Sequence, residues 1–208
     1  MILGLTGTYC AGKNYIAGFL EKKGLPVLDV DKFGHTAIET EKKAILGRFG
    51  SDILKPDGTI DRKLLGGKVF GNPAELAALE AIIHPAVNKG TDAWIAGMQG
   101  KPCVINAALL HRSSAFSNLD AIILVQASFL TRLFRAKKRD HLSWPELFRR
   151  LRSQKEFLSQ YFSGKTDIYK VENPGYFGSK FLCPGGKGIH KKPEDRINEI
   201  LSFLGIGV

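Results

Sequence analysis

Short apolar runs alternate along this chain with longer stretches of helical periodicity. Five runs predict β-strands, because each is short, rich in β-forming residues and bounded by Gly, Pro, Asp or Asn: residues 2–5, 26–30, 102–110, 121–127 and 168–172. Most of them are apolar on both faces, as parallel strands covered by helices are. The pattern therefore predicts an α/β fold with a five-stranded parallel sheet.

The first two helical regions differ in length. Residues 13–23 predict a helix that ends at a glycine cap, Gly24, and its apolar stripe is Ile16, Phe19 and Leu20. Residues 39–99 are helical in pattern throughout, with breaks predicted at Pro56-Asp57-Gly58, Asn72-Pro73 and His84-Pro85. A crossover between parallel strands needs far fewer residues, so this second stretch predicts an inserted helical subdomain.

A second insertion is predicted after the fourth strand. Residues 129–138 indicate a helix, and Ser143 with Glu146 forms the pattern of a capping box that opens another. That helix carries basic residues over an apolar stripe: Arg149, Arg150, Arg152 and Lys155 over Leu147, Leu151 and Leu158. Residues 173–192 are rich in Gly, Pro and Lys, which favours a mobile basic loop, and residues 193–203 predict a final amphipathic helix.

Composition and charge narrow the class of protein. The chain has 208 residues, of which 44% are hydrophobic and 24% charged, so general disorder is excluded. Thirty Lys and Arg residues against twenty Asp and Glu give a net charge of +10. Such a balance favours polyanionic partners, namely nucleic acid, an acidic membrane face or phosphate-rich small molecules, without choosing among them.

Cysteine usage and apolar run length bear on the compartment. Cys10, Cys103 and Cys183 are an odd number of widely spaced cysteines, which disfavours a disulfide framework or a thiolate metal site. The apolar start is too short for a secretory signal, and no run approaches 18 apolar residues. We expect a soluble, cytoplasmic protein.

The clearest chemical motif is Gly7-Thr8-Tyr9-Cys10-Ala11-Gly12-Lys13, which fits G-x-x-x-x-G-K between a predicted strand and a predicted helix. Such glycines let successive N–H groups converge on an anion, and the lysine ammonium reaches a β- or γ-phosphate. The alternative is a glycine turn with a surface lysine. Asn14 stands where the motif has Ser or Thr, so magnesium is bound there through water or more weakly.

Two carboxylates, Asp29 and Asp31, end the second predicted strand, where open α/β sheets bind ligands. Strand alternation sends both side chains to the same face. A carboxylate beside a transferring phosphoryl group can accept the proton of the acceptor hydroxyl. The alternative is a solvated or helix-capping aspartate.

Taken together, the motifs resemble the dephospho-CoA kinase family over about residues 2–173. The matching features occur in the family's order and spacing: the loop at residues 7–13, Asp29 and Asp31, Asp57-Gly58-Thr59 with Arg62, Phe70 with Asn72-Pro73, His84-Pro85, Arg135, Arg139-Asp140, Gln154 and Asn173. The resemblance implies transfer of the ATP γ-phosphoryl group to the ribose 3′-hydroxyl of dephospho-CoA, the last step of coenzyme A synthesis.

The resemblance also implies an architecture. It is a P-loop NTPase core of three α/β/α layers, like that of nucleoside monophosphate kinases, with an inserted helical acceptor-binding domain and a small helical lid. On this chain the parts become residues 1–31 (core), 32–99 (CoA and acceptor domain), 100–128 (core), 129–163 (lid and return helix) and 164–208 (core, with a basic glycine-rich loop at 174–192).

Site residues follow from the resemblance position by position. Asp31 is implied as the catalytic base, assisted by Lys13 and Arg139, and Asn14 as the Mg²⁺ position, directly or through water. The implied ATP site comprises Gly7, Thr8, Tyr9, Cys10, Ala11, Gly12, Lys13, Asn14, Tyr15 and Arg139. The implied acceptor site comprises Asp31, His35, Arg62, Phe70, His84 and Leu109, although His84 could equally be a core histidine.

The chain departs from the family pattern near the acceptor. His35 replaces an arginine that usually follows the aspartate pair, and the run Ala107-Ala108-Leu109-Leu110-His111 lacks the usual proline and acid. Two alternatives therefore stay open: a related kinase with another acceptor, and a nucleotide- or nucleic-acid-binding relative that lost catalysis. We expect ATP and dephospho-CoA as partners, a monomer, and neither a membrane nor a nucleic acid.

Overall fold

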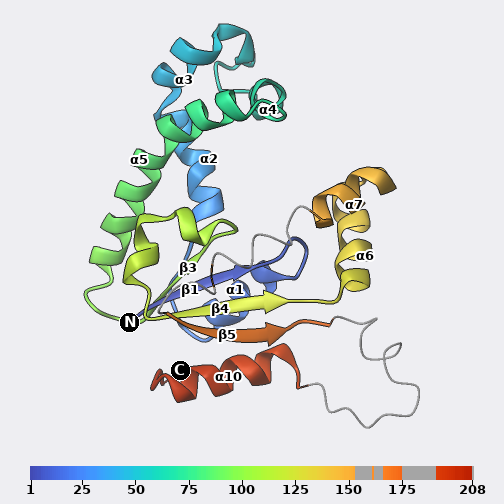
Figure 1. Cartoon of the computed structure of the whole chain (residues 1–208). Helices are drawn as coiled ribbons and strands as arrows, with labels where there is room; N and C mark the ends of the chain where they lie inside the picture. The colour runs from blue at the N-terminus through green and yellow to red at the C-terminus, as the bar shows by residue number, and fades with distance from the viewer. Residues whose placement is uncertain (153–160, 162–165, 175–190, 208) are drawn as a thin grey trace. The chain divides into compact units, whose positions relative to one another are not determined.

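The computed structural model describes residues 1–152, 161, 166–174 and 191–207. Five strands form one sheet in the order β2-β3-β1-β4-β5, which places β1 at its centre (Figure 1). β1 runs parallel to both of its neighbours, and β4 runs parallel to β5. The predicted five-stranded parallel sheet is confirmed, with strands β1 (Ile2–Gly7), β2 (Val27–Asp29), β3 (Cys103–Asn106), β4 (Ala121–Gln126) and β5 (Asp167–Glu172).

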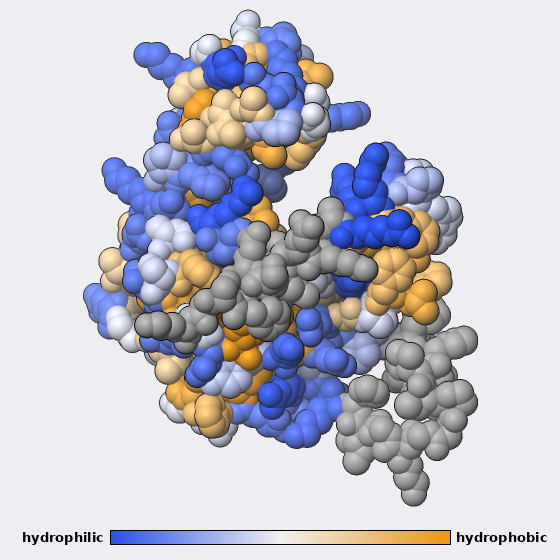
Figure 2. Space-filling view, in the orientation of Figure 1, coloured by the Kyte–Doolittle hydropathy of each residue, from blue (hydrophilic) through white to orange (hydrophobic). Residues whose placement is uncertain are grey.

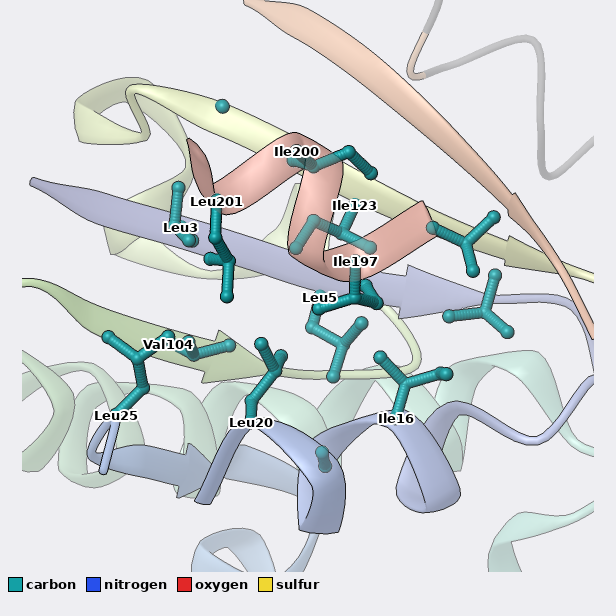
Figure 3. Close-up of a cluster of buried hydrophobic side chains, with 14 of the residues drawn as sticks. Leu3, Leu5, Ile16, Leu20, Leu25, Val104, Ile123, Ile197, Ile200 and Leu201 are labelled. Atoms are coloured by element: carbon teal, nitrogen blue, oxygen red, sulfur yellow. The ribbon is translucent and has the colours of Figure 1, made fainter. Parts of the chain in front are cut away.

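The main core lies between one face of this sheet and two helices, α1 (Lys13–Lys22) and α10 (Pro193–Phe203). Figure 3 shows the strand side chains Leu3, Leu5, Val104 and Ile123 meeting the apolar stripes of both helices, Ile16, Leu20, Ile197, Ile200 and Leu201. All of them are almost completely buried, so the helices that carry these stripes are fixed by apolar burial.

The other face of the sheet is approached closely by two short 3₁₀ helices, η2 (Leu110–Arg112) and η3 (Ser114–Asn118). A Cβ atom on Gly4 would lie 2.6 Å from a methyl group of Leu110 and 2.8 Å from one of Leu119, so β1 needs a glycine there. Tyr161 is buried beside this region, with its ring edge toward Phe116 and its hydroxyl 3.1 Å from Nδ1 of His111.

Residues Leu28–Gly97 form a second compact unit, which is built of helices around its own core. Its elements are α2 (Val30–Thr40), α3 (Lys42–Phe49), η1 (Ser51–Ile53), α4 (Arg62–Val69) and α5 (Pro73–Gly97). The core gathers aliphatic side chains and one phenylalanine: Ile38, Ile45, Phe49, Ile53, Ile60, Leu65, Val69 and Leu79. The Asp57-Gly58 break is a turn, in which Asp57 Oδ1 accepts from the Thr59 N–H at 2.8 Å.

Helices α6 (Phe129–Asp140) and α7 (Trp144–Arg152) follow β4. One half of the predicted capping box is present, because Glu146 Oε2 accepts from the Ser143 N–H at 3.1 Å; it also accepts from the Ser143 hydroxyl at 2.6 Å. The stripe residues Leu147 and Leu151 are buried as predicted, whereas Lys155, Leu158 and most of the predicted basic loop, residues 175–190, lie outside the described residues. On its outer surface the pair exposes hydrophobic residues beside basic ones (Figure 2), among them Phe129, Leu130, Phe134, Trp144 and Phe148.

Three predicted boundaries are wrong. The third strand ends at Asn106, because its pairing with β1 stops there: the last paired residues are Leu5 and Asn106, and the Ala107 N–H makes a final backbone hydrogen bond to Leu5 O. Val30 begins α2 instead of ending a strand, because Asp29 caps that helix. The break at His84-Pro85 does not occur: Pro85 lies inside α5, where the apolar contacts of the preceding turns, made by Leu79, Ile82 and Ile83, outweigh one missing backbone hydrogen bond. No helix among the described residues is long and apolar enough to cross a membrane.

Candidate nucleotide site

The loop between β1 and α1 has the backbone of an anion-binding nest. Cys10 and Gly12 both have positive φ angles, 59° and 98°, and the Ala11 N–H closes a turn onto Thr8 O at 2.9 Å. Gly12 is the N-cap of α1, and no side chain of the described residues makes a capping hydrogen bond at that end of the helix. The positive end of the α1 dipole therefore lies at this loop, where it favours a phosphate.

Close packing explains the first glycine of the motif. A Cβ atom on Gly7 would lie 2.6 Å from the carbonyl oxygen of Val125 on β4 and 3.1 Å from that residue's Cβ atom. Strand β1 can therefore carry the loop this close to β4 only with a glycine at this position.

Two polar side chains from later in the chain hold the outer side of the loop. Arg135 of α6 donates through Nη1 to Ala11 O at 2.9 Å and to Cys10 O at 3.4 Å. Its Nη2 donates to Asn173 Oδ1 at 3.2 Å, and Asn173 Nδ2 donates to Ala11 O at 2.9 Å. In this structure Arg135 therefore donates hydrogen bonds to carbonyl groups of the loop.

Arg139, one turn further along α6, is engaged by its neighbours. Its guanidinium donates to Asp140 at 2.7 and 3.0 Å, and it lies 5.0 Å from the centre of the Tyr9 ring. The Tyr9 hydroxyl donates to the same carboxylate, and the Tyr9 and Cys10 side chains pack against the core of α6 and α7. Burial raises the pKa of the Cys10 thiol, and the nearby charges of Arg139, Arg135 and Arg132 oppose this rise.

The metal position offers neutral oxygen atoms. Asn14 is exposed, and its Oδ1 lies 3.5 Å from Nδ2 of Asn106, the last residue of β3, which pairs in register with Leu5 of β1. Asn106 is 1% exposed, and its Oδ1 is buried without a hydrogen-bond partner among the described residues. Amide oxygens are hard ligands that fit Mg²⁺ or its bound water. Among the described residues, no group of three or more His, Cys, Asp or Glu side chains that could hold a metal ion is found.

Most predicted acceptor residues belong to the helical unit. Asp31 is exposed in the first turn of α2, whereas Asp29 caps that helix by accepting from the Lys32 N–H at 3.1 Å. The prediction that strand alternation aligns the two carboxylates is wrong, because the chain leaves the strand at Asp29. The other four of these residues are exposed or half-buried on their helices: His35 on α2, Arg62 and Phe70 at the two ends of α4, and His84 on α5.

Leu109 is 44% exposed in the turn between β3 and η2, and so lies in the other unit. The structure thus brings the loop residues together with Arg135, Arg139 and Tyr9 within one unit. The sequence pattern gave no role to Asn106, and it treated Asn173 only as the end of a strand. Both are polar residues at the carboxyl ends of parallel strands, and that shared position is the signal that could have found them.

Comparison with known proteins shows the family of this chain. The family model described as dephospho-CoA kinase matches residues 1–161. Proteins named dephospho-CoA kinase from Shouchella clausii and Geobacter metallireducens are 36% and 38% identical over 160 residues, which cover 74% of this chain and 81% and 80% of theirs. The solved structure of TT1252 from Thermus thermophilus superposes with a TM-score of 0.76 at 26% identity, covering 98% of this chain and 97% of that one. The chain belongs to the dephospho-CoA kinase family.

Proposed function

We propose that this chain transfers the γ-phosphoryl group of ATP to the ribose 3′-hydroxyl of dephospho-CoA, giving CoA and ADP. The observation that carries the proposal is the loop Gly7–Lys13, with two residues at positive φ and an uncapped helix N-terminus, within a chain of this family. Phosphoryl transfer depends on positioning and charge stabilisation, and a loop of this conformation supplies both.

Each part of the loop has a proposed role. Backbone N–H groups of the loop and of the first turn of α1, other than those of Ala11 and Tyr15, which donate to Thr8 O and Gly12 O, hold the phosphate oxygens. The Lys13 ammonium neutralises charge that develops on the transferred group. Arg139 adds a second cation once it exchanges Asp140 and Tyr9 for ATP phosphates. Asn14, with the buried Asn106 amide behind it, would hold Mg²⁺ through water, and the bound ion would neutralise phosphate charge.

On the acceptor side we assign Asp31 as the general base for the 3′-hydroxyl. Arg62 would pair with an acceptor phosphate, and Phe70, His84, His35 and Leu109 would line the rest of the acceptor site. The exposure of Asp31, Arg62 and Phe70 supports this assignment, because a side chain that must reach a ligand is not committed to a core. We further propose that the enzyme acts in the cytoplasm and that it is a monomer. Light scattering after gel filtration measures the molar mass and so tests the monomeric state.

The direct test is to incubate the isolated protein with ATP, Mg²⁺ and dephospho-CoA and to measure CoA and ADP. We expect Lys13→Ala to lower kcat/KM by about 10²–10³-fold and Asp31→Asn to lower kcat by about 10²–10⁴-fold, with unchanged melting temperatures. Matched controls are Lys22→Ala, at the other end of α1, and Asp195→Asn, in the first turn of α10. Full activity in either site variant would refute its assignment.

The acceptor substitutions call for a specificity measurement. We expect dephospho-CoA to give the highest kcat/KM in a panel that includes nucleosides, nucleotides and pantetheine derivatives. A higher value for another acceptor would show that His35 and the altered run after β3 have changed the specificity, while leaving the kinase chemistry in place.

A further inference from the structure

We propose that Arg135 and Asn173 are positioning residues, which lock the phosphate loop in its anion-binding conformation and attach helix α6 to it. The inference rests on the proposed ATP-dependent function, and it concerns how the loop keeps its shape before ATP arrives. The two residues are 38 positions apart in the sequence, and each contacts Ala11, which is more than 100 positions away.

The first argument concerns the carbonyl groups of the loop. A nest points consecutive N–H groups at one anion, so the carbonyl groups between them must face elsewhere. Arg135 Nη1 donates to two consecutive carbonyl oxygens, Cys10 at 3.4 Å and Ala11 at 2.9 Å. A cation on the outer side of the loop therefore favours the arrangement in which the N–H groups face the phosphate.

The second argument concerns the amide of Asn173, which has both ends in use. Its Nδ2 donates to Ala11 O at 2.9 Å, and its Oδ1 accepts from Arg135 Nη2 at 3.2 Å. The side chain is 7% exposed, and its backbone N–H donates to Gln126 O at 2.7 Å, beyond the last rung of the β4–β5 ladder. The sheet thus fixes Asn173, and Asn173 fixes both the loop and the guanidinium.

The third argument concerns Gly12. A Cβ atom there would lie only 2.1 Å from Nδ2 of Asn173, and the φ angle of 98° already disfavours other residues. The amide of Asn173 therefore occupies the place that a side chain at position 12 would need. This close approach indicates that loop and amide are parts of one packed arrangement.

A second hydrogen bond joins α6 to the residues that follow β5. Thr131 Oγ1, one turn before Arg135, donates to Pro174 O at 3.0 Å. Helix α6 is thereby held at two successive turns by the residues that follow β5. Movement of α6 would disturb the carbonyl contacts of the loop, and so the helix that bears Arg139 is coupled to the conformation of the nest.

The competing role of Arg135 is direct contact with the γ-phosphate. The affinities for ATP and for ADP, which lacks that phosphate, distinguish this role from positioning of the loop. We would titrate the full chain with ATP and with ADP, using Arg135→Met, Asn173→Ala and the double variant, with exposed Lys138→Met as the control on the same helix. Positioning predicts that each single variant weakens both nucleotides by the same factor, about tenfold to a hundredfold. The double variant should be scarcely weaker than either single one, because the two side chains act as a unit.

Three outcomes would overturn the proposal: unchanged binding, loss for ATP without loss for ADP, and additive losses in the double variant. Arg135→Lys keeps the positive charge and loses the planar arrangement of several donors, and it serves as a second variant in case Arg135→Met does not fold. We expect its affinities for ATP and for ADP to lie between those of the wild type and Arg135→Met.

Hydrogen exchange of the nucleotide-free protein gives a test that does not depend on ATP. The amides of Ala11, Gly12 and Lys13 should exchange about tenfold faster in Arg135→Met, while those of the buried β1 residues stay unchanged. Failure of the wild-type protein to bind ATP would refute the proposed function, whereas unchanged loop exchange would refute the positioning role.

Discussion

The phosphate loop and the helical unit Leu28–Gly97 present candidate functional residues in opposite ways. In the loop the chemistry belongs to the backbone, and side chains from α6 and from the end of β5 hold its carbonyl groups in place. In the helical unit an apolar core fixes the helices, while Asp31, Arg62 and Phe70 point outward from their ends. The candidate nucleotide site thus consists of backbone groups within the fold, whereas the candidate acceptor residues are exposed side chains on the surface of their unit.

This difference between the loop and the helical unit indicates that stability and function are coupled in the loop and are separate in the helical unit. A change in the loop alters the backbone conformation, and therefore affects nucleotide binding and local packing together. A change in an outward-facing residue of the helical unit should alter acceptor binding alone, because such a side chain takes no part in the core.

Among the variants that test this comparison, Gly12→Ala has the largest expected effect. The new methyl group would meet Asn173 Nδ2 at 2.1 Å at a φ angle of 98°, so the nest cannot keep its shape. We expect ATP affinity to fall by about tenfold to a hundredfold, measured by titration calorimetry. Gly18→Ala is the control, since Gly18 lies within α1 with nothing within 4 Å of its Cβ position, and it should stabilise the protein by about 0.5–1 kcal/mol. Unchanged ATP affinity in Gly12→Ala would contradict the claim that nucleotide binding depends on the backbone conformation of the loop.

The last residue of α4, Val69, and the C-cap residue that follows it, Phe70, test the helical unit. Val69 is 2% exposed and Phe70 is 77% exposed. We expect Val69→Ala to lower the free energy of unfolding by about 2 kcal/mol. Phe70→Ala should leave that free energy within about 0.5 kcal/mol and raise the KM for dephospho-CoA by about threefold to tenfold. Denaturant unfolding and steady-state kinetics measure both, and a Phe70 variant that destabilises the protein without changing KM would contradict the separation.

The smallest effect concerns the Cys10 thiol. Because burial raises its pKa, the thiol stays protonated near neutral pH, and the thiolate forms only at a pH above that of an exposed cysteine. In a Cys103→Ser, Cys183→Ser background we expect alkylation by iodoacetamide at pH 7.5 to be several-fold slower than in the unfolded chain, with the rate rising further toward alkaline pH. Equal rates in the folded and unfolded chains would show that the loop leaves Cys10 open to solvent.

Local patterns predicted well whatever depends on neighbouring residues. The phosphate motif is contiguous, and its strand–loop–helix setting is visible in the chain itself. The final helix, residues 193–203, and the Ser143–Glu146 capping box follow from rules that span a few residues. The local rule that a proline breaks a helix failed at Pro85, which stays inside α5 because the turns before it pack into the core of the helical unit.

Several contacts of the site stayed beyond the reach of these patterns, because they join residues that meet only in the folded chain. The sequence by itself determined the parallel sheet, the glycine-containing loop between a strand and a helix, and the family to which the chain belongs. Only the tertiary structure decided that Arg135 and Asn173 meet at Ala11, that Tyr9 shares a carboxylate with Arg139, and that Asn106 is buried behind Asn14. Hydrogen bonds of this kind depend on the packing of α6 and on the order of the strands, and no periodicity within one segment encodes either.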